Sequence, residues 1–119
     1  MTPKWNNSQP IYQQVRDHAV AMILDGILGD GDALPSVRKV ASDFQLNPIT
    51  VSKAYQSLVD DGLIEMRRGL GMFVKPGSQQ ALLKAEREKF LAKEWPKIST
   101  RIRRLGIDPE QLFEQLEQG

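Results

Sequence analysis

Two amphipathic segments separated by only three residues restrict the fold more than any other feature of the sequence. Apolar side chains recur at positions i, i+3, i+4 and i+7 in both segments, which is the spacing of one helix face. These positions hold Val37, Val40, Ala41 and Phe44 in the first segment and Val51, Ala54, Tyr55 and Leu58 in the second. Gln45-Leu46-Asn47 lies between them. Helix, three-residue turn and helix is the spacing of a helix-turn-helix motif.

Local capping signals predict where both helices begin and end. Ser36 can cap a helix that runs to about Phe44, because a serine oxygen accepts a hydrogen bond from a free amide of the first turn. Asn47 followed by Pro48 is typical of an N-cap followed by the first helical residue. Gly62 suits the end of the second helix, which we expect over residues 47–61.

The flanking segments predict a helix on one side and a hairpin on the other. Residues 10–26 show helical apolar spacing, and the glycines and aspartates of residues 26–35 favour a loop. Leu63–Arg67 and Met72–Val74 are typical of short strands. Arg68–Gly71 joins them, and either of its glycines can adopt the positive φ that a hairpin needs. We therefore expect a β-hairpin wing beside the helix-turn-helix.

A second module begins after Pro76-Gly77, where the composition becomes rich in Ala, Lys, Glu and Gln. We expect a winged helix-turn-helix domain over residues 1–76 and a short helical tail over residues 77–119, in a fold that is mainly α with one small β-hairpin. The tail predicts helices from Ser78 to about Glu94, from Pro96 to Leu105, and from Asp108 to the C-terminus. Asp108-Pro109-Glu110-Gln111 resembles an N-cap with a capping-box partner.

Apolar stripes on the tail predict an interface. Their residues are Leu82, Leu83, Phe90, Leu91, Ile98, Ile102, Leu105, Leu112, Phe113 and Leu116. About forty residues of short helices cannot bury such stripes alone, so the stripes must pack on the first module or on a second copy of the chain. We expect the tail to form a homodimer. The sequence leaves open whether its helices pack within one chain or swap between two.

Several classes of protein are excluded by what the sequence lacks. It has no Cys and one His, which removes disulfide frameworks and zinc sites. Nothing forms a nucleophile, base and orienting set with His18, so we expect no enzyme, no cofactor and no metal. The longest apolar run, Ala19–Leu24, has six residues, and Met1–Trp5 opens no signal peptide. We therefore expect a cytoplasmic protein without a membrane partner.

The positions of the charges indicate a partner although the formal net charge is only +1. The outer face of the second helix shows Thr50, Ser52, Lys53, Gln56 and Ser57, with Ile49 near its tip. Arg38 and Lys39 lie outside the apolar stripe of the first helix, and Arg67 and Arg68 lie at the hairpin. Two cationic elements that flank a polar helix suit the backbone of duplex DNA. The alternative is an ordinary solvated helix face.

A family resemblance adds to this interpretation. Leu34-Pro35-Ser36-Val37-Arg38-Lys39-Val40-Ala41, Asn47-Pro48-Ile49-Thr50-Val51-Ser52-Lys53-Ala54-Tyr55-Gln56-Ser57-Leu58, Asp61-Gly62-Leu63-Ile64 and Arg68-Gly69-Leu70-Gly71-Met72-Phe73-Val74 follow one another in order. Over about residues 9–75 the chain resembles the winged helix-turn-helix of GntR-family transcription regulators, and its Asn-Pro and short helical tail are similar to those of the YtrA-type subfamily.

The resemblance implies that Arg38, Thr50 with its neighbours, and Arg68-Gly69 contact DNA. Two positions depart from the family pattern. Ile49 lies where YtrA-type proteins often carry a polar residue, so an apolar contact with a thymine methyl could replace a hydrogen bond. Met72 lies where a small Thr is usual. The metal or organic-acid pocket of the larger family members is not implied for this chain, because its tail is short and it has a single His.

From these observations we expect a homodimeric, sequence-specific repressor that binds an inverted-repeat operator of double-stranded DNA near its own operon, often a transporter operon by resemblance. The predicted DNA-binding residues are Ser36, Arg38, Lys39, Pro48, Ile49, Thr50, Ser52, Lys53, Arg67, Arg68 and Gly69. The alternative is a winged-helix protein-interaction module without specific DNA readout. The operator, the regulated genes, repression as against activation, and a small-molecule effector stay open at this point.

Overall fold

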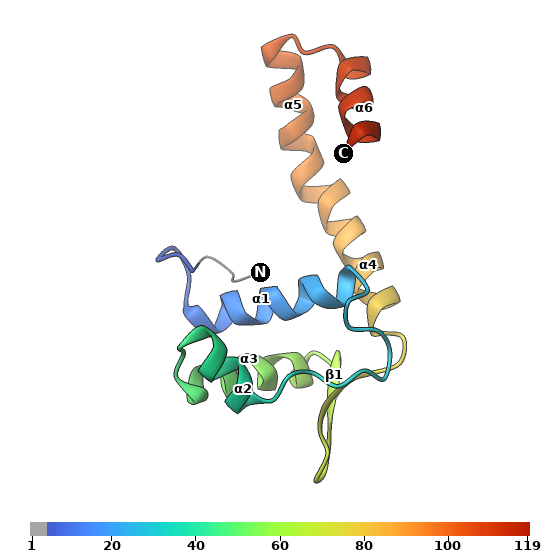
Figure 1. Ribbon diagram of the computed structural model, residues 1–119. Helices are drawn as coiled ribbons and strands as arrows, with labels where there is room; N and C mark the ends of the chain where they lie inside the picture. The colour runs from blue at the N-terminus through green and yellow to red at the C-terminus, as the bar shows by residue number, and fades with distance from the viewer. Residues whose placement is uncertain (1–4) are drawn as a thin grey trace. The chain divides into compact units, whose positions relative to one another are not determined.

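The computed structural model describes residues 5–119, and it is mainly helical with one two-stranded antiparallel hairpin (Figure 1). Met1–Lys4, which contributed to the prediction that no signal peptide is present, lie outside the described residues. The chain divides into two compact units, the first ending at Leu82 and the second running from Leu83 to Gly119. Within residues 5–119 no helix is both long and apolar enough to cross a membrane.

Three helices of the first unit confirm the helix-turn-helix prediction. They are α1 (Ile11–Leu24), α2 (Val37–Phe44) and α3 (Pro48–Asp60). Ser36 Oγ accepts from the amide of Lys39 at 3.0 Å, and Asn47 Oδ1 accepts from the amide of Ile49 at 2.9 Å. Both predicted N-caps are therefore confirmed. The turn between α2 and α3 begins at Gln45, whose φ of 55° lies in the left-handed region.

The hairpin consists of β1 (Ile64–Arg67) and β2 (Gly71–Val74), paired from Ile64↔Val74 to Arg67↔Gly71. The predicted first strand begins one residue too early, at Leu63, and the predicted second strand begins one residue too late, at Met72. Leu63 lies outside β1, because its amide donates to the carbonyl of Leu58 at the end of α3. Gly71 lies inside β2 because it pairs with Arg67.

The segment predicted as a plain loop, residues 26–35, also contributes to the sheet. Ala33 forms an isolated antiparallel bridge with Phe73. The amide of Leu34 donates to the carbonyl of Met72 at 2.8 Å, and the amide of Val74 donates to the carbonyl of Asp32 at 2.9 Å. This segment therefore covers the outer edge of β2 and attaches the hairpin to the start of α2. Its Gly and Asp content favours turns and conceals the pairing.

One core holds α1, α3 and the hairpin together. Its largest fully buried side chains are Ile23, Val51, Leu58, Ile64 and Val74, each at most 1% exposed. The positions predicted to point inward from α3 are thus confirmed as core positions.

The first turns of α4 (Ser78–Lys89) belong to the same core. Ser78 Oγ donates to the carbonyl of Leu63 at 2.8 Å. Leu82 is 9% exposed and lies in the core cluster of the first unit. Leu82 was predicted as part of the dimer stripe, and this is wrong for its side chain, because the first unit already buries it.

Two aromatic side chains, Trp5 and His18, pack against Phe44 at the end of α2. The Trp5 ring meets the Phe44 ring edge-on at 5.9 Å, and His18 meets the same ring at 6.0 Å. Gln14, which is buried, donates to the carbonyl of Asn6 and accepts from its amide, both at 2.8 Å. The backbone next to Trp5 is therefore held on α1, and His18 serves as a packing residue.

The second unit contains the rest of α4, the π-helical turn η1 (Phe90–Glu94), α5 (Trp95–Leu105) and α6 (Pro109–Gln118). The predicted stretches Ser78 to about Glu94 and Pro96 to Leu105 correspond to α4 with η1 and to α5, and the helical backbone continues from one to the other without a loop. Pro96 has no amide hydrogen and its ring crowds the carbonyl four residues earlier. The wider π turn before it accommodates both effects. Asp108 accepts from the amide of Glu110 at 3.1 Å, which confirms that N-cap.

Candidate nucleic-acid interface

The outer face of α3 is the centre of the candidate interface. Because Val51, Tyr55 and Leu58 are buried, the opposite side of the helix faces solvent. This exposed side carries Ile49, Ser52, Lys53 and Gln56, with Thr50 half-buried at its border. Ile49 is 76% exposed beside the capped N-terminus. A second helix of a helix-turn-helix contacts base edges with its N-terminal residues, so these side chains are positioned to do so.

The start of α2 is fixed against α3 by a buried tyrosine. Tyr55 donates its hydroxyl hydrogen to the carbonyl of Pro35 at 2.7 Å. Burial raises the pKa of Tyr55 to about 12, so the phenol keeps this hydrogen at neutral pH. The bond holds the residue just before the Ser36 cap at a fixed place relative to α3.

The predicted cations of α2 differ in their environments. Arg38 is exposed and has no ion-pair partner among residues 5–119. Lys39 lies 3.2 Å from the carboxylate of Asp43, one turn further along the helix. Ser36 is exposed, although its oxygen already accepts from Lys39. Arg38 is therefore the cation of α2 that is available to a phosphate.

The two predicted arginines of the hairpin also differ. Arg67 lies 3.2 Å from Glu65, and its guanidinium lies over the Phe73 ring at 4.3 Å. Arg68 is exposed and has no such partner within the described residues. Gly69, with φ 79°, occupies the third position of a tight turn in which the amide of Leu70 donates to the carbonyl of Arg67. The turn therefore presents Arg68 at the tip and holds Arg67 on the strand.

A cleft separates the hairpin from the start of α2. Its volume is about 400 Å³. Ser36 and Val37 line one side, and Gly69, Leu70 and Met72 are among the residues of the other. The structure thus brings the predicted residues of α2 and of the wing to the two sides of one opening.

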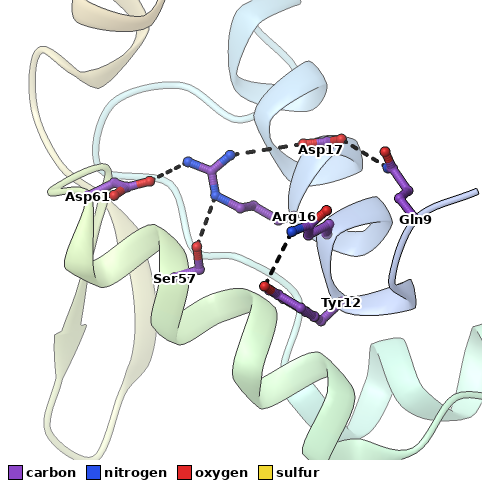
Figure 2. Close-up of polar contacts among 7 residues, drawn as sticks. Gln9, Tyr12, Arg16, Asp17, Ser57 and Asp61 are labelled. Carbon is purple, nitrogen blue, oxygen red and sulfur yellow. Dashed lines mark hydrogen bonds and ion pairs between the residues drawn. The ribbon is translucent and has the colours of Figure 1, made fainter.

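Sequence reasoning missed two residues of α1 that hold α3 in place. The ammonium of Lys53 lies 4.1 Å from the centre of the Tyr12 ring, a cation–π contact. Figure 2 shows the second contact, in which Arg16 Nε donates to Ser57 Oγ at 3.0 Å and a terminal nitrogen pairs with Asp61. Ser57, assigned from its spacing to the open polar face, is therefore directed toward α1. These partners lie 41 residues and more from Arg16, so no local signal identifies them.

A helix-turn-helix with an exposed, capped second helix and a hairpin wing defines a winged-helix DNA-binding regulator. The family model described as "Bacterial regulatory proteins, gntR family" matches residues 11–74, and the chain belongs to this family. The chain is 32% identical to the HTH-type transcriptional repressor YtrA of Bacillus subtilis over 94% of its own length and 85% of the relative's.

Solved structures agree with this assignment. A transcriptional regulator from Oenococcus oeni superposes with a TM-score of 0.72 and 25% identity, over 98% of this chain and 95% of that one. The DNA-binding domain of AraR in complex with its operator ORX1 superposes with a TM-score of 0.56 and 25% identity, over 60% of this chain and 92% of that one. The predicted fold class and the resemblance to YtrA-type regulators are confirmed. The chain is a DNA-binding transcription regulator and not an enzyme.

Proposed function

We propose that this regulator is a homodimeric repressor that acts in the cytoplasm, each copy reading one half of an inverted-repeat operator near its own operon. The observation that carries the proposal is the distribution of paired and unpaired cations. Arg16, Lys39 and Arg67 have carboxylate partners, whereas Arg38, Lys53 and Arg68 have none among residues 5–119. Arg38, Lys53 and Arg68 are thus the cations of α2, α3 and the hairpin strands and turn that have no carboxylate partner in the described part of the chain, and these are the elements that a winged helix applies to a duplex.

Base readout is assigned to the N-terminal half of α3. Pro48, Ile49 and Ser52 are exposed there, and Thr50 is half-buried. Ile49 offers an apolar contact to a thymine methyl, and the hydroxyls of Thr50 and Ser52 can bond to base edges. Lys53, released from the Tyr12 ring, reaches a phosphate or a guanine. Ser36, Lys39, Arg67 and Gly69 complete the proposed contact set at its borders.

The apolar face of the second unit supports a second copy as the partner. A groove of about 630 Å³ runs between α5 and α6 and is lined almost entirely by apolar side chains. Ile98 is 41% exposed and Phe113 is 63% exposed within it. The proposed interface residues are Leu83, Phe90, Leu91, Ile98, Ile102, Leu105, Leu112, Phe113 and Leu116. An exposed apolar face of this extent is typical of a subunit interface. Two-fold symmetry then predicts half-sites separated by about 10 base pairs or a multiple of that distance.

Fluorescence anisotropy on two duplexes tests the proposal. One duplex is the DNA upstream of the protein's own gene and the other is a scrambled sequence of the same composition. The native protein is expected to bind the first more tightly, with an affinity that falls as salt rises. Lys53→Ala and Arg38→Ala are each expected to weaken binding by about tenfold and to reduce the salt slope by about one.

Lys93→Ala is the matched control, because it removes the same charge from an exposed position of η1 in the second unit. It is expected to bind like the native protein. Equal binding of both duplexes, unchanged by Lys53→Ala, would contradict the proposal and favour a winged helix that docks on another protein.

A further inference from the structure

The tip of the hairpin carries an apolar side chain that the proposed contacts do not use. Leu70 is 73% exposed, which ranks it with the most exposed large hydrophobic residues of the chain. A single exposed leucine needs no explanation on an ordinary surface. This one lies in the turn between β1 and β2, two residues from the unpaired Arg68. The position of Leu70 at the tip of the wing, and not its exposure alone, therefore suggests a function.

The backbone makes this tip narrow. Gly69 and Gly71 flank Leu70 with φ values of 79° and 117°, a region that side chains with a Cβ rarely adopt. Because neither neighbour carries a side chain, the turn presents only Arg68 and Leu70 to its surroundings. The minor groove of B-DNA is about 6 Å wide, so it admits such a tip more readily than it admits a helix.

The chemistry of the two side chains selects one kind of base pair. In the minor groove a G·C pair adds the guanine amino donor to the acceptors that every pair presents. Leucine cannot accept a hydrogen bond, so a leucine over that amino group leaves a desolvated donor without a partner. A·T segments lack the amino group, and their narrower groove has a more negative potential that attracts arginine. Leu70 and Arg68 therefore both favour A·T base pairs.

We propose that Leu70 is a specificity residue, which restricts the base pairs beneath the wing to A·T through the minor groove. The inference rests on the proposed operator binding. It adds a prediction of the base composition in the part of the operator that lies under the wing and outside the reach of α3. A hydrophobic protein partner for the tip is the competing assignment. The unpaired Arg68 beside Leu70 favours a polyanion over an apolar protein surface.

Inosine substitution tests the proposal on the full chain. Selection from a library of random duplexes supplies a bound sequence, and hydroxyl-radical footprinting locates the minor-groove positions that the wing protects. Those pairs are then changed to G·C or to I·C. Inosine lacks the guanine amino group, so I·C resembles A·T in the minor groove and G·C in the major groove. The G·C duplex is expected to bind about tenfold more weakly, and the I·C duplex is expected to bind like the A·T duplex.

Two variants connect the effect to the side chain. Leu70→Asn supplies a hydrogen-bond acceptor of similar size, so the difference between G·C and I·C is expected to fall to less than about twofold. Ile27→Asn is the matched control, because Ile27 is 64% exposed in the loop after α1 and lies outside the hairpin. It is expected to keep the full discrimination.

The failures are distinguishable. If G·C and I·C bind equally well, or equally badly, the minor-groove amino group is not read and the inference is overturned while operator binding stands. If Leu70→Asn discriminates like the native protein, a residue other than Leu70 is responsible. If the library yields no preferred sequence, the proposed function fails and this inference fails with it.

Discussion

The two units of this chain differ in how far they bury their apolar side chains. In the first unit, Val51 and Leu58 of α3 are fully buried, and the hairpin adds Ile64 and Val74 at 1% exposure or less. In the second unit, η1, α5 and α6 bury no residue across residues 90–118. Phe113 and Leu116 there are 63% and 75% exposed. The first unit therefore buries its own apolar side chains, and the second leaves an apolar face exposed.

This difference agrees with the two functions proposed for the chain, DNA reading by the first unit and assembly by the second. A DNA-reading surface must hold its side chains in fixed positions before DNA arrives, which requires a self-sufficient core. An assembly surface needs exposed apolar area, since burial of that area drives association. The two tryptophans report on the units separately, because Trp5 packs on Phe44 in the first and Trp95 lies 6.4 Å from Phe90 in the second.

The largest expected effect comes from making one chemical change in both units. Leu58→Ala is expected to lower the free energy of unfolding of the first unit by about 2–5 kcal/mol, since it opens a cavity at a fully buried position. Leu116→Ala, at a position 75% exposed, is expected to change it by less than about 0.5 kcal/mol. Urea unfolding followed by Trp5 fluorescence in a Trp95→Phe background measures both. Similar losses from the two variants would show that the first unit depends on the tail.

The next effect concerns association of the tail. Ile98→Asp combined with Phe113→Asp places two charges in the groove between α5 and α6, and is expected to raise the dimer dissociation constant at least about a hundredfold. Sedimentation equilibrium measures the dissociation constant. Trp95 fluorescence in a Trp5→Phe background reports the exposure of Trp95 to solvent when the dimer dissociates. Gln115→Asp, on an exposed position of α6, is the control and is expected to leave the dimer intact. A dimer that persists in the double variant would place the interface elsewhere.

A smaller effect separates positioning of the recognition helix from contact with DNA. Arg16→Met removes the bonds to Ser57 and Asp61 (Figure 2) and is expected to lower the stability of the first unit by about 1 kcal/mol. It is also expected to weaken operator binding without changing the salt slope, because Arg16 neutralises Asp61 and not a phosphate. Anisotropy at several salt concentrations distinguishes it from Lys53→Ala, which lowers the slope. Arg87→Met, an exposed arginine of α4, is the control.

Local signals in the sequence predicted most of the first unit. The caps at Ser36 and Asn47 and the inward stripe of α3 follow from neighbouring residues, since capping and helical periodicity act over one or two turns. The Arg67–Glu65 pair was also within reach, because residues two apart on a strand lie on the same side.

Features that depend on distant residues were not predictable in this way. The attachment of Ala33 to Phe73, and of Arg16 to Ser57, joins segments about forty residues apart. The cation–π contact of Lys53 with Tyr12 likewise needs the packing of α1 on α3. The π turn that accommodates Pro96 has no clear sequence signal, because the usual effect of proline is to end a helix. The DNA-contact residues themselves stay a prediction.

The last expected effect is a loss of stability at alkaline pH that is confined to the first unit. Tyr55 is 3% exposed, and burial raises its pKa from 10.0 to about 12. The unfolded chain therefore releases this proton at lower pH than the folded chain does. The contribution to stability is complete below about pH 10 and is lost as the pH rises toward about 12.

Tyr55→Phe is the variant that isolates this contribution. At neutral pH it is expected to cost about 1 kcal/mol, because the carbonyl of Pro35 loses its donor. Between about pH 10 and 12 the stability of the native protein is expected to fall more steeply than that of the variant, so the two curves converge. Urea unfolding at Trp5 measures both curves, and parallel curves would contradict the raised pKa. Since both tyrosines precede residue 83, the transition reported by Trp95 contains no tyrosine titration of its own, and a matching alkaline loss there would mean that the two units unfold together.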